Sequence, residues 1–197
     1  MKENYNNFQI IRKDAKGCFV ESLCDYFPAG KAHLQFVAYN ANMPEGQRQT
    51  ALVNLYIGVD ELQEICRKIS SGELRYMLTQ LKQTGNFNQP LMEWLGGTSA
   101  GKLAAMGKSR KDGMSVSRTA KLLPGKKSDF LFVADSGPGE QNRQGLIVPR
   151  FGTNPENHIS VSMTWESLSE LFLLTKANYE AWLAAKYLRM MMQPAGQ

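Results

Sequence analysis

The sequence predicts an α+β protein in which two ββββα repeats form two packed antiparallel four-stranded sheets with helices. Three observations support this prediction. Two stretches of the chain match each other at a constant spacing, strand-like segments alternate with turn residues, and each group of such segments precedes an apolar stripe with helical spacing. We expect one domain over residues 1–197, with the first repeat at about 5–84 and the second at about 100–192.

An internal repeat organises the chain. "GCFVESLCDYFPAGKAHLQFVAYN" (17–40) matches "GMSVSRTAKLLPGKKSDFLFVADS" (113–136) at a constant offset of 96 residues without gaps. "VNLYIGVDELQEIC" (53–66) then matches "ISVSMTWESLSELF" (159–172) at an offset of 106. The additional residues of the second copy predict a longer loop around "SGPGEQNRQGLIVPRFGTNPEN". Each copy is therefore expected to have the same order of elements.

The first repeat begins with four strand-like segments, which the turn sequences "DAKG", "FPAGK" and "NMPEG" separate. The segments are "NFQIIRKD" (7–14), "CFVESLCDYF" (18–27), "KAHLQFVAYN" (31–40) and "TALVNLYIG" (50–58). An apolar stripe beginning at Val59 then predicts a helix, which "SSG" at 70–72 interrupts before "ELRYMLTQLK". This order corresponds to an antiparallel meander followed by helices.

The second repeat has the same order, but its first strand has the weakest signal and is expected near "GKLAAMGKS" (101–109). The next two strands are the counterparts of 18–27 and 31–40 in the first copy. Thr164 is a good N-cap for a final helix from Trp165 to about Met192.

The composition indicates a globular protein. No run of about 18 apolar residues is present, so no membrane span is expected, and the start of the chain lacks the features of a signal or transit peptide. The three cysteines form no C-x-x-C pair, which suits reduced thiols in a cytoplasm. His33 and His158 have no ligand-spaced neighbours, so we expect neither a metal nor another cofactor.

The stretch "GGTSAGKL" (96–103) has the glycines and lysine of a phosphate-binding P-loop, but two features argue against a nucleotide hydrolase. Leu103 stands where a P-loop needs a hydroxyl group to hold Mg²⁺. Asp135, at the end of "FLFVAD", could be the metal-holding acid, but its counterpart in the first repeat is Tyr39, so this segment is interpreted as a sheet strand. Since no catalytic constellation is recognisable, we expect a protein that is not an enzyme.

Positive charge is concentrated in one segment. Residues 96–130 carry eight basic and two acidic side chains, a net charge of +6, whereas the whole chain has a net charge of +5. The remainder of the chain is therefore close to neutral. A basic surface on such a protein favours a polyanionic partner, and a solvated, solubilising surface is the alternative.

This layout resembles the Whirly and PUR single-stranded-DNA-binding proteins. The resemblance covers most of residues 7–190 and is strongest in "TAKLLPGKKSDFLFVADSG" and "HISVSMTWESLSELFLLTKANYEAWL". The Lys-Gly-Lys-Ala-Ala-Leu motif of the Whirly family is absent, and the nearest strings, "AGKAHL" (29–34) and "AGKLAAM" (100–106), lie elsewhere in the repeats. The resemblance implies packed sheets, helices at the centre of a tetramer, single strands along the sheet surfaces, and a bacterial, nucleoid-associated protein.

Proteins of this kind hold single strands with a basic groove and with surfaces on which bases stack. The basic candidates are Lys31, Lys102, Lys108, Arg110, Lys111, Arg118, Lys121, Lys126 and Lys127. The candidates for stacking, with packing as the alternative role, are Trp94, Tyr39 and Phe8. Core or oligomer contacts are instead expected of Phe36, its repeat equivalent Phe132, and the helical Trp165, Phe172 and Trp182.

Strand alternation separates the faces of the predicted sheets. One face is expected to be buried and consists of Cys18, Val20, Cys24 and Tyr26, with the counterparts Met114, Val116, Ala120 and Leu122. The opposite face of the second copy is expected to contact phosphates and consists of Ser115, Ser117, Thr119 and Lys121. Arg118 falls on the apolar face, from which a strand-edge or bulge position would free it.

The function that we expect is the binding of single-stranded nucleic acid with little sequence specificity, in a protective role or in transcription regulation. DNA is favoured, and RNA stays open. The alternative is an oligomeric protein-interaction scaffold on the same fold, without nucleic-acid binding. Self-association is expected in both cases, and the resemblance favours a tetramer.

Overall fold

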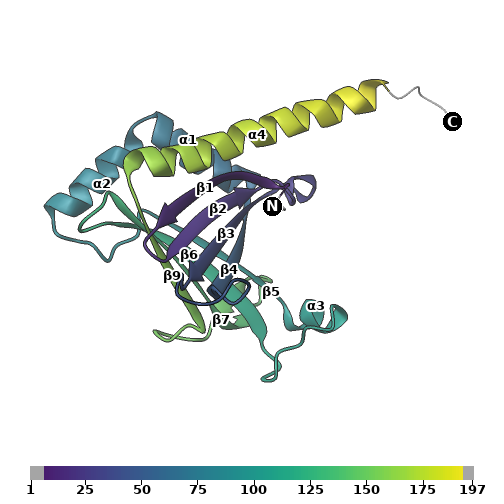
Figure 1. Ribbon diagram of the computed structural model, residues 1–197. Helices are drawn as coiled ribbons and strands as arrows, with labels where there is room; N and C mark the ends of the chain where they lie inside the picture. Colours follow the sequence, from purple (N-terminus) through teal and green to yellow (C-terminus); the bar gives the residue numbers. More distant parts are fainter. Residues whose placement is uncertain (1–6, 193–197) are drawn as a thin grey trace.

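The computed structural model describes residues 7–192, which form two antiparallel sheets and four α-helices (Figure 1). The first sheet has the strand order β1-β2-β3-β4. Its strands are β1 (Gln9–Ala15), β2 (Cys18–Leu23), β3 (Lys31–Tyr39) and β4 (Gln49–Gly58). They match the four predicted segments, except that β2 is shorter and precedes a 3₁₀ turn at Phe27–Ala29.

The second sheet has five strands among the described residues, where four were expected. They are β5 (Met92–Thr98), β6 (Ser115–Pro124), β7 (Phe130–Gln141), β8 (Ile147–Pro149) and β9 (Asn157–Met163). β5, β6 and β7 are neighbours in that order, and β8 and β9 pair with opposite ends of β7. The additional strand β8 comes from the long loop that the repeat offset predicts.

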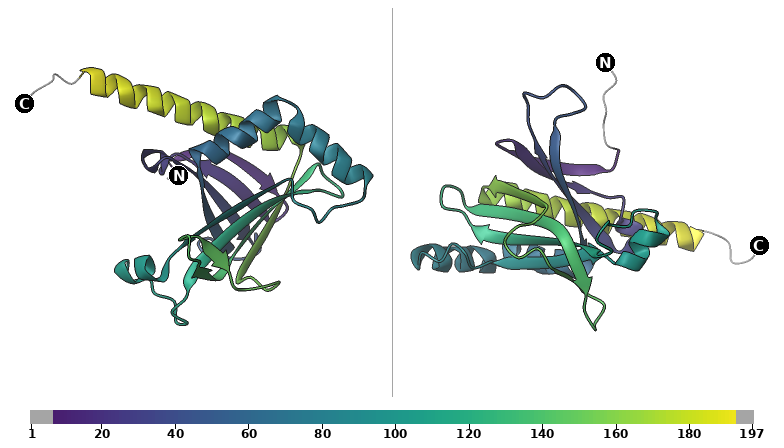
Figure 2. Two further views of the ribbon diagram at one scale, coloured as in Figure 1. Left: turned by 180° about the vertical axis from the view of Figure 1, so that it is seen from behind. Right: turned by 90° about the horizontal axis from the view of Figure 1, so that it is seen from below.

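The helices are α1 (Val59–Ser70), α2 (Glu73–Gln83), α3 (Ala100–Ala105) and α4 (Trp165–Met192). The predicted helix start at Val59, its interruption before residue 73 and the helix from Trp165 to Met192 are confirmed. The Thr164 hydroxyl accepts the Ser167 backbone N–H at 3.2 Å, as expected of an N-cap. The two views of Figure 2 show the C-terminal half of α4 extending beyond the sheets.

The two sheets and the first half of α4 enclose one core. The rings of Phe36 and Phe132 lie 4.8 Å apart between the sheets, and both side chains are fully buried. The Thr175 hydroxyl of α4 donates to the Ser22 hydroxyl of β2 at 2.7 Å, which attaches the helix to the first sheet. The core positions predicted for the two equivalent phenylalanines are confirmed.

The first strand of the second half lies earlier than predicted. Residues 101–109 contain α3 instead of a strand, and β5 ends at Thr98. The chain leaves the strand there because the Ser99 hydroxyl accepts the Lys102 backbone N–H at 3.3 Å and caps α3. The second half of the chain therefore begins near residue 92 rather than near residue 100.

Gly97 accounts for part of "GGTSAGKL". A Cβ atom at Gly97 would lie 2.5 Å from the Val116 carbonyl oxygen and 2.7 Å from the Ile147 Cβ, so the position has no room for a side chain. Lys102 lies in α3. The glycines and the lysine of this stretch thus belong to a sheet-edge strand and a short helix, not to a phosphate-binding loop.

The polar face predicted for β6 is not accessible to phosphates. Ser115, Ser117 and Thr119 have exposures of only 5%, 0% and 4%. Strand β8 packs over this face, because a Cβ atom at Gly139 would meet Ser117 at 2.7 Å and Ile147 of β8 at 2.8 Å. The prediction of phosphate contacts by these three residues is therefore wrong.

The alternation rule also fails at the end of β2. Cys18 and Val20 are buried as predicted, but Tyr26 is 40% exposed. β2 ends at Leu23, so the chain has already turned before Tyr26 and the two-residue period no longer applies.

Candidate nucleic-acid interface

A groove lies between the open edges of the two sheets. β4 is an edge strand of the first sheet and β5 an edge strand of the second. The groove between them has a volume of about 520 Å³. Its charged and aromatic lining residues include Lys31, Lys102, Lys108, Arg118, Tyr26 and Tyr56. Folding thus brings four of the predicted basic residues together with two tyrosines.

Arg118 is the most deeply placed cation of the groove. It projects from β6, is half-buried, and donates from Nη1 to the Thr98 hydroxyl at 2.9 Å. Burial lowers the pKa of its guanidinium, and Tyr56 opposes this effect. No carboxylate within residues 7–192 forms an ion pair with Arg118. Because a charge withdrawn from water without a counter-ion is unfavourable, this arrangement fits an anionic ligand.

Tyr26 and Tyr56 form an aromatic wall beside Arg118. Their ring centroids lie 4.2 Å apart, and the His33 ring lies 4.5 Å from that of Tyr56. His33 Nδ1 is 2.9 Å from Asp25 Oδ1, which holds the imidazole in place. Burial and a hydrogen bond with Tyr26 raise the pKa of Tyr56 to about 12, so this phenol is uncharged at neutral pH. Such rings offer a surface on which a base can stack.

Three exposed lysines border the groove. Lys31 begins β3, Lys102 lies in α3, and Lys108 lies in the loop between α3 and β6. None of the acids in the described part of the chain forms an ion pair with them. Among the lining residues the acid is Glu61, whose Oε2 accepts the Gly58 N–H at 2.8 Å. The lining therefore carries four positive charges against one negative charge.

Two other predicted basic residues are paired with acids. Arg110 Nη2 lies 2.7 Å from Glu156 Oε1 and 2.6 Å from Asp112 Oδ2. These hydrogen bonds raise the pKa of Arg110 and lower the pKa values of both acids. Lys121 Nζ lies 3.2 Å from Glu93 Oε1. These two cations are therefore largely compensated within the protein itself.

The remaining predicted basic residues lie outside the groove. Lys111 is exposed in the turn before β6. Lys126 and Lys127 border a smaller hollow of about 330 Å³ at the β6–β7 turn, where Lys126 Nζ lies 5.8 Å from the centroid of the Phe87 ring. The predicted basic residues thus divide into three groups. Lys31, Lys102, Lys108 and Arg118 line the groove, Lys126 and Lys127 lie at the β6–β7 turn, and Arg110, Lys111 and Lys121 lie at neither place.

The predicted stacking residues do not line the groove. Trp94 is only 2% exposed, and its ring lies 5.6 Å from Phe132 in the core, so a base cannot reach it. The stacking role predicted for Trp94 is therefore wrong. Tyr39 is half-buried near the end of β3, and Phe8 is 53% exposed just before β1.

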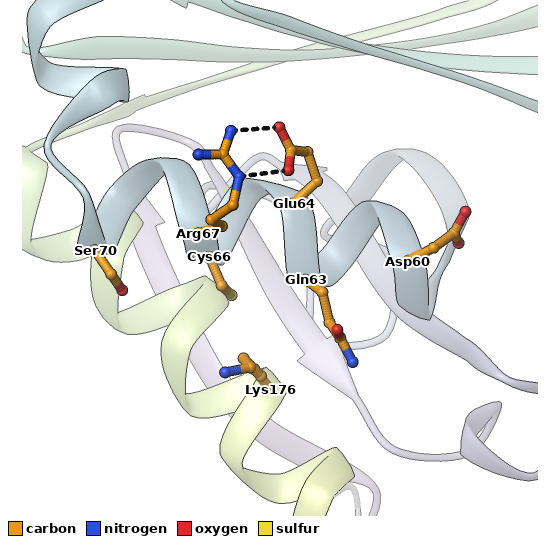
Figure 3. A pocket seen from close by; sticks show the side chains of 7 residues that line it. All are labelled: Asp60, Gln63, Glu64, Cys66, Arg67, Ser70 and Lys176. Atoms are coloured by element: carbon orange, nitrogen blue, oxygen red, sulfur yellow. Dashed lines mark hydrogen bonds and ion pairs between the residues drawn. The ribbon is translucent and has the colours of Figure 1, made fainter.

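A further hollow of about 570 Å³ lies between α1 and α4 (Figure 3). Figure 3 shows Arg67 paired with Glu64 on α1, with Arg67 Nε donating at 2.8 Å. Cys66 also faces this hollow, and burial raises the pKa of its thiol to about 11, which disfavours the reactive thiolate. Since its charges compensate each other, this hollow is a poorer site for an anion than the groove.

Sequence reasoning missed Tyr26, Asn54 and Tyr56 as lining residues. A signal for two of them exists, because Asn54 and Tyr56 alternate with the core residues Leu55 and Ile57 in "NLYIG". That alternation places them on the face directed away from the core. Tyr26 has no such signal, since it lies in the turn after β2, where the sequence predicts a continuing strand.

No protein-family model matches the chain, and no match is found among curated proteins or solved structures. None of the helices described is both long enough and apolar enough to cross a bilayer. Residues 7–192 contain no group of three or more His, Cys, Asp or Glu side chains that could hold a metal ion. Fold and site together define an α+β protein with two antiparallel sheets and a basic, tyrosine-lined groove between their edges.

Proposed function

We propose that this protein binds single-stranded nucleic acid, DNA in preference to RNA, in the groove between β4 and β5. Arg118 and the lysines at the rim contact phosphates, while Tyr26 and Tyr56 stack against bases, so binding depends little on base sequence. The protein acts in the cytoplasm by binding rather than by catalysis, in a protective or regulatory role.

The observation that carries this proposal is the state of Arg118. Its guanidinium is half-buried, lacks an acidic partner in the described residues, and shares the groove with three unpaired lysines and two tyrosines. A structural arginine at such a position would normally be paired with a carboxylate. Phosphates supply the missing negative charge, and planar bases match the tyrosine rings beside it.

We also propose that the fold is of the Whirly type, with one ββββα unit present twice. Residues that the repeat aligns contact each other. Phe36 and its equivalent Phe132 lie 4.8 Å apart. Cys66, which the second offset aligns with Phe172, donates from Sγ to the Phe172 carbonyl oxygen at 3.4 Å. Equivalent residues meet in this way on the axis of an internal two-fold, which favours a duplicated unit.

The proposal can be tested by fluorescence anisotropy of a labelled single strand of about 30 nucleotides and of a duplex of equal length. We expect tighter binding of the single strand. Arg118→Met should weaken this binding by about tenfold or more, because hydrogen bonds to charged groups contribute about 1.5–3 kcal/mol. Lys16→Met removes one charge at the β1–β2 turn, outside the groove lining, and should change the affinity by less than about twofold.

Two results would refute the proposal. One is the absence of binding to the single strand at low salt. The other is binding that Arg118→Met and Lys16→Met weaken equally, because this would indicate attraction by net charge alone rather than by the groove.

A second candidate function is that of an oligomeric scaffold, which the C-terminal half of α4 favours. Large apolar side chains exposed there are Tyr187, Leu188, Met190, Met191 and Met192. Apolar groups gathered on a projecting helix mark a protein-interaction surface. Leu188→Lys should lower the oligomeric state in sedimentation velocity if this surface joins copies of the chain. A scaffold without nucleic-acid binding would show this change and no affinity for the single strand.

A further inference from the structure

We propose that the hollow at the β6–β7 turn, lined by Phe87, Lys126 and Lys127, is a second contact site for the same strand that occupies the groove. Strands long enough to reach both sites then bind more tightly than strands that fill only the groove. This inference rests on the proposed function and adds to it a second site, a path and a minimum strand length.

The hollow combines an apolar floor with a basic rim. Leu123 and Leu131 form part of the floor, and the half-buried ring of Phe87 approaches from the loop between α2 and β5. Lys126 Nζ lies 5.8 Å from the Phe87 ring centroid, and Lys127 borders the same hollow. A ring and apolar side chains beside two ammonium groups are the surroundings that a base and its neighbouring phosphates require.

The two lysines are available for a ligand. Asp129 is the nearby acid on the same turn, but it lies 3.8 Å from Lys82 Nζ and accepts the Trp165 backbone N–H at 2.8 Å. Neither Lys126 nor Lys127 forms an ion pair with an acid in the described part of the chain, and both are exposed. Their charges thus resemble those of the groove lysines and differ from those of the paired Arg110.

The edge strand β5 joins the groove to the hollow, since residues 95–98 line the groove and Phe87, shortly before this strand, lines the hollow. Leu95, which is 46% exposed, lines the groove, and Leu123 lines the hollow. Between them Glu93 pairs with Lys121 in the β5–β6 register, on the same side of the strands. A strand that leaves Arg118 crosses the sheet edge at exposed Leu95 to the other side of β6, and it passes the paired Lys121 before it reaches Lys126.

The distance sets the strand length. From Arg118 to Pro124, where β6 ends, the strand advances by six residues, or about 20 Å at ~3.3 Å per residue, and Lys126 follows in the turn. A helical strand rises by about 3.4 Å per nucleotide along its axis and by more when it is stretched, so about eight nucleotides or fewer cover this span. A tetranucleotide fills the groove without reaching the hollow, whereas a dodecanucleotide reaches both.

The test compares oligothymidylates of four and twelve nucleotides in competition anisotropy. A site of four nucleotides can be occupied in about nine positions along a dodecamer, so the dodecamer should bind about ninefold more tightly than the tetramer even with one site. A second contact site should raise this ratio of affinities to about a hundredfold. The double variant Lys126→Met, Lys127→Met should lose about tenfold for the dodecamer and nothing for the tetramer. For the dodecamer, the slope of log K against log salt should also become shallower by about 1.4, because two phosphate contacts are lost.

The control is a double variant of Lys16 and Lys186 to Met, which removes the same charge away from the path. Equal losses for the two double variants, or an unchanged length ratio in the Lys126, Lys127 variant, would overturn the second site. Binding to the groove would then still be tested by Arg118→Met, which should weaken both lengths alike. If neither length binds to the protein at low salt, the proposed function fails together with this inference.

Discussion

The salt dependence of binding can be calculated from the charges of the groove. For single strands, log K falls against log salt with a slope of about −0.7 for each phosphate contacted. Four cations line the groove, so if all of them contact phosphates the slope should be about −2.8 or steeper. Affinity should then fall at least about fiftyfold between 50 and 200 mM salt.

The perturbation is the pair Lys102→Met and Lys108→Met. Both side chains are exposed, so their replacement should leave the fold intact. Removing two contacts makes the slope shallower by about 1.4. The loss of affinity that the groove contacts cause over the same salt range should then fall to about sevenfold. The measurement is fluorescence anisotropy with a dodecamer at five or more salt concentrations, with urea denaturation as a check on folding.

The matched control replaces Lys16 and Lys186 with Met and should leave the slope unchanged. The reasoning is refuted if the Lys102, Lys108 variant retains the slope of the unmodified protein, or if both double variants reduce it equally. Either result would mean that the lysines bordering the groove make no specific phosphate contacts.

Three further predictions concern the fold around the site. Gly97→Ala should lower the free energy of unfolding by about 1–3 kcal/mol, because its methyl group overlaps backbone, whereas Gly101→Ala, with nothing within 4 Å, should raise it by about 0.5–1 kcal/mol in urea titrations. Arg110→Met should flatten the acid limb of the stability curve. The pKa of Glu156 is lowered from its ordinary value of 4.5, so the pair stabilises the folded protein above pH 4.5 and this stabilisation is lost as the pH falls through the lowered pKa. Urea midpoints measured from pH 6 to pH 2 test this prediction. Trp94→Phe should lower stability by about 1–3 kcal/mol and leave oligonucleotide affinity within about twofold, since the indole lies in the core; weakened binding by a fully folded variant would contradict that location.

Much of the fold could be predicted from the sequence because its signals are local. The stripe from Val59 and the cap at Thr164 are properties of adjacent residues, and both helices begin where these signals indicate. The core position of Phe36 and Phe132 follows from their equivalence in the repeat, since a residue found at the same place in both sheets is a good candidate for the layer between them.

The errors arise where burial depends on distant segments. Ser117 is polar and occupies an alternating position typical of a surface residue, yet β8 covers it. The residues of β6 itself contain no signal that another strand packs over this face. Trp94 is hidden for a related reason: residues 92–98, with Glu93 and two glycines, have too weak a strand signal to be assigned to the sheet that buries the indole. Arg118 was placed correctly by parity on the inner side of β6, but whether that side is core or groove depends on where the two sheets separate.

The separation of the sheets also bears on the kind of ligand that the groove favours. Open strand edges such as those of β4 and β5 can pair with an extended peptide as readily as they can flank a nucleic acid. A neutral peptide would bury Arg118 further without supplying a counter-charge, which is unfavourable. An acidic peptide would supply the charge but would leave Tyr26 and Tyr56 without planar partners. A ligand that satisfies both must carry anionic and planar groups in regular alternation, and a single strand of nucleic acid has this chemistry along its whole length.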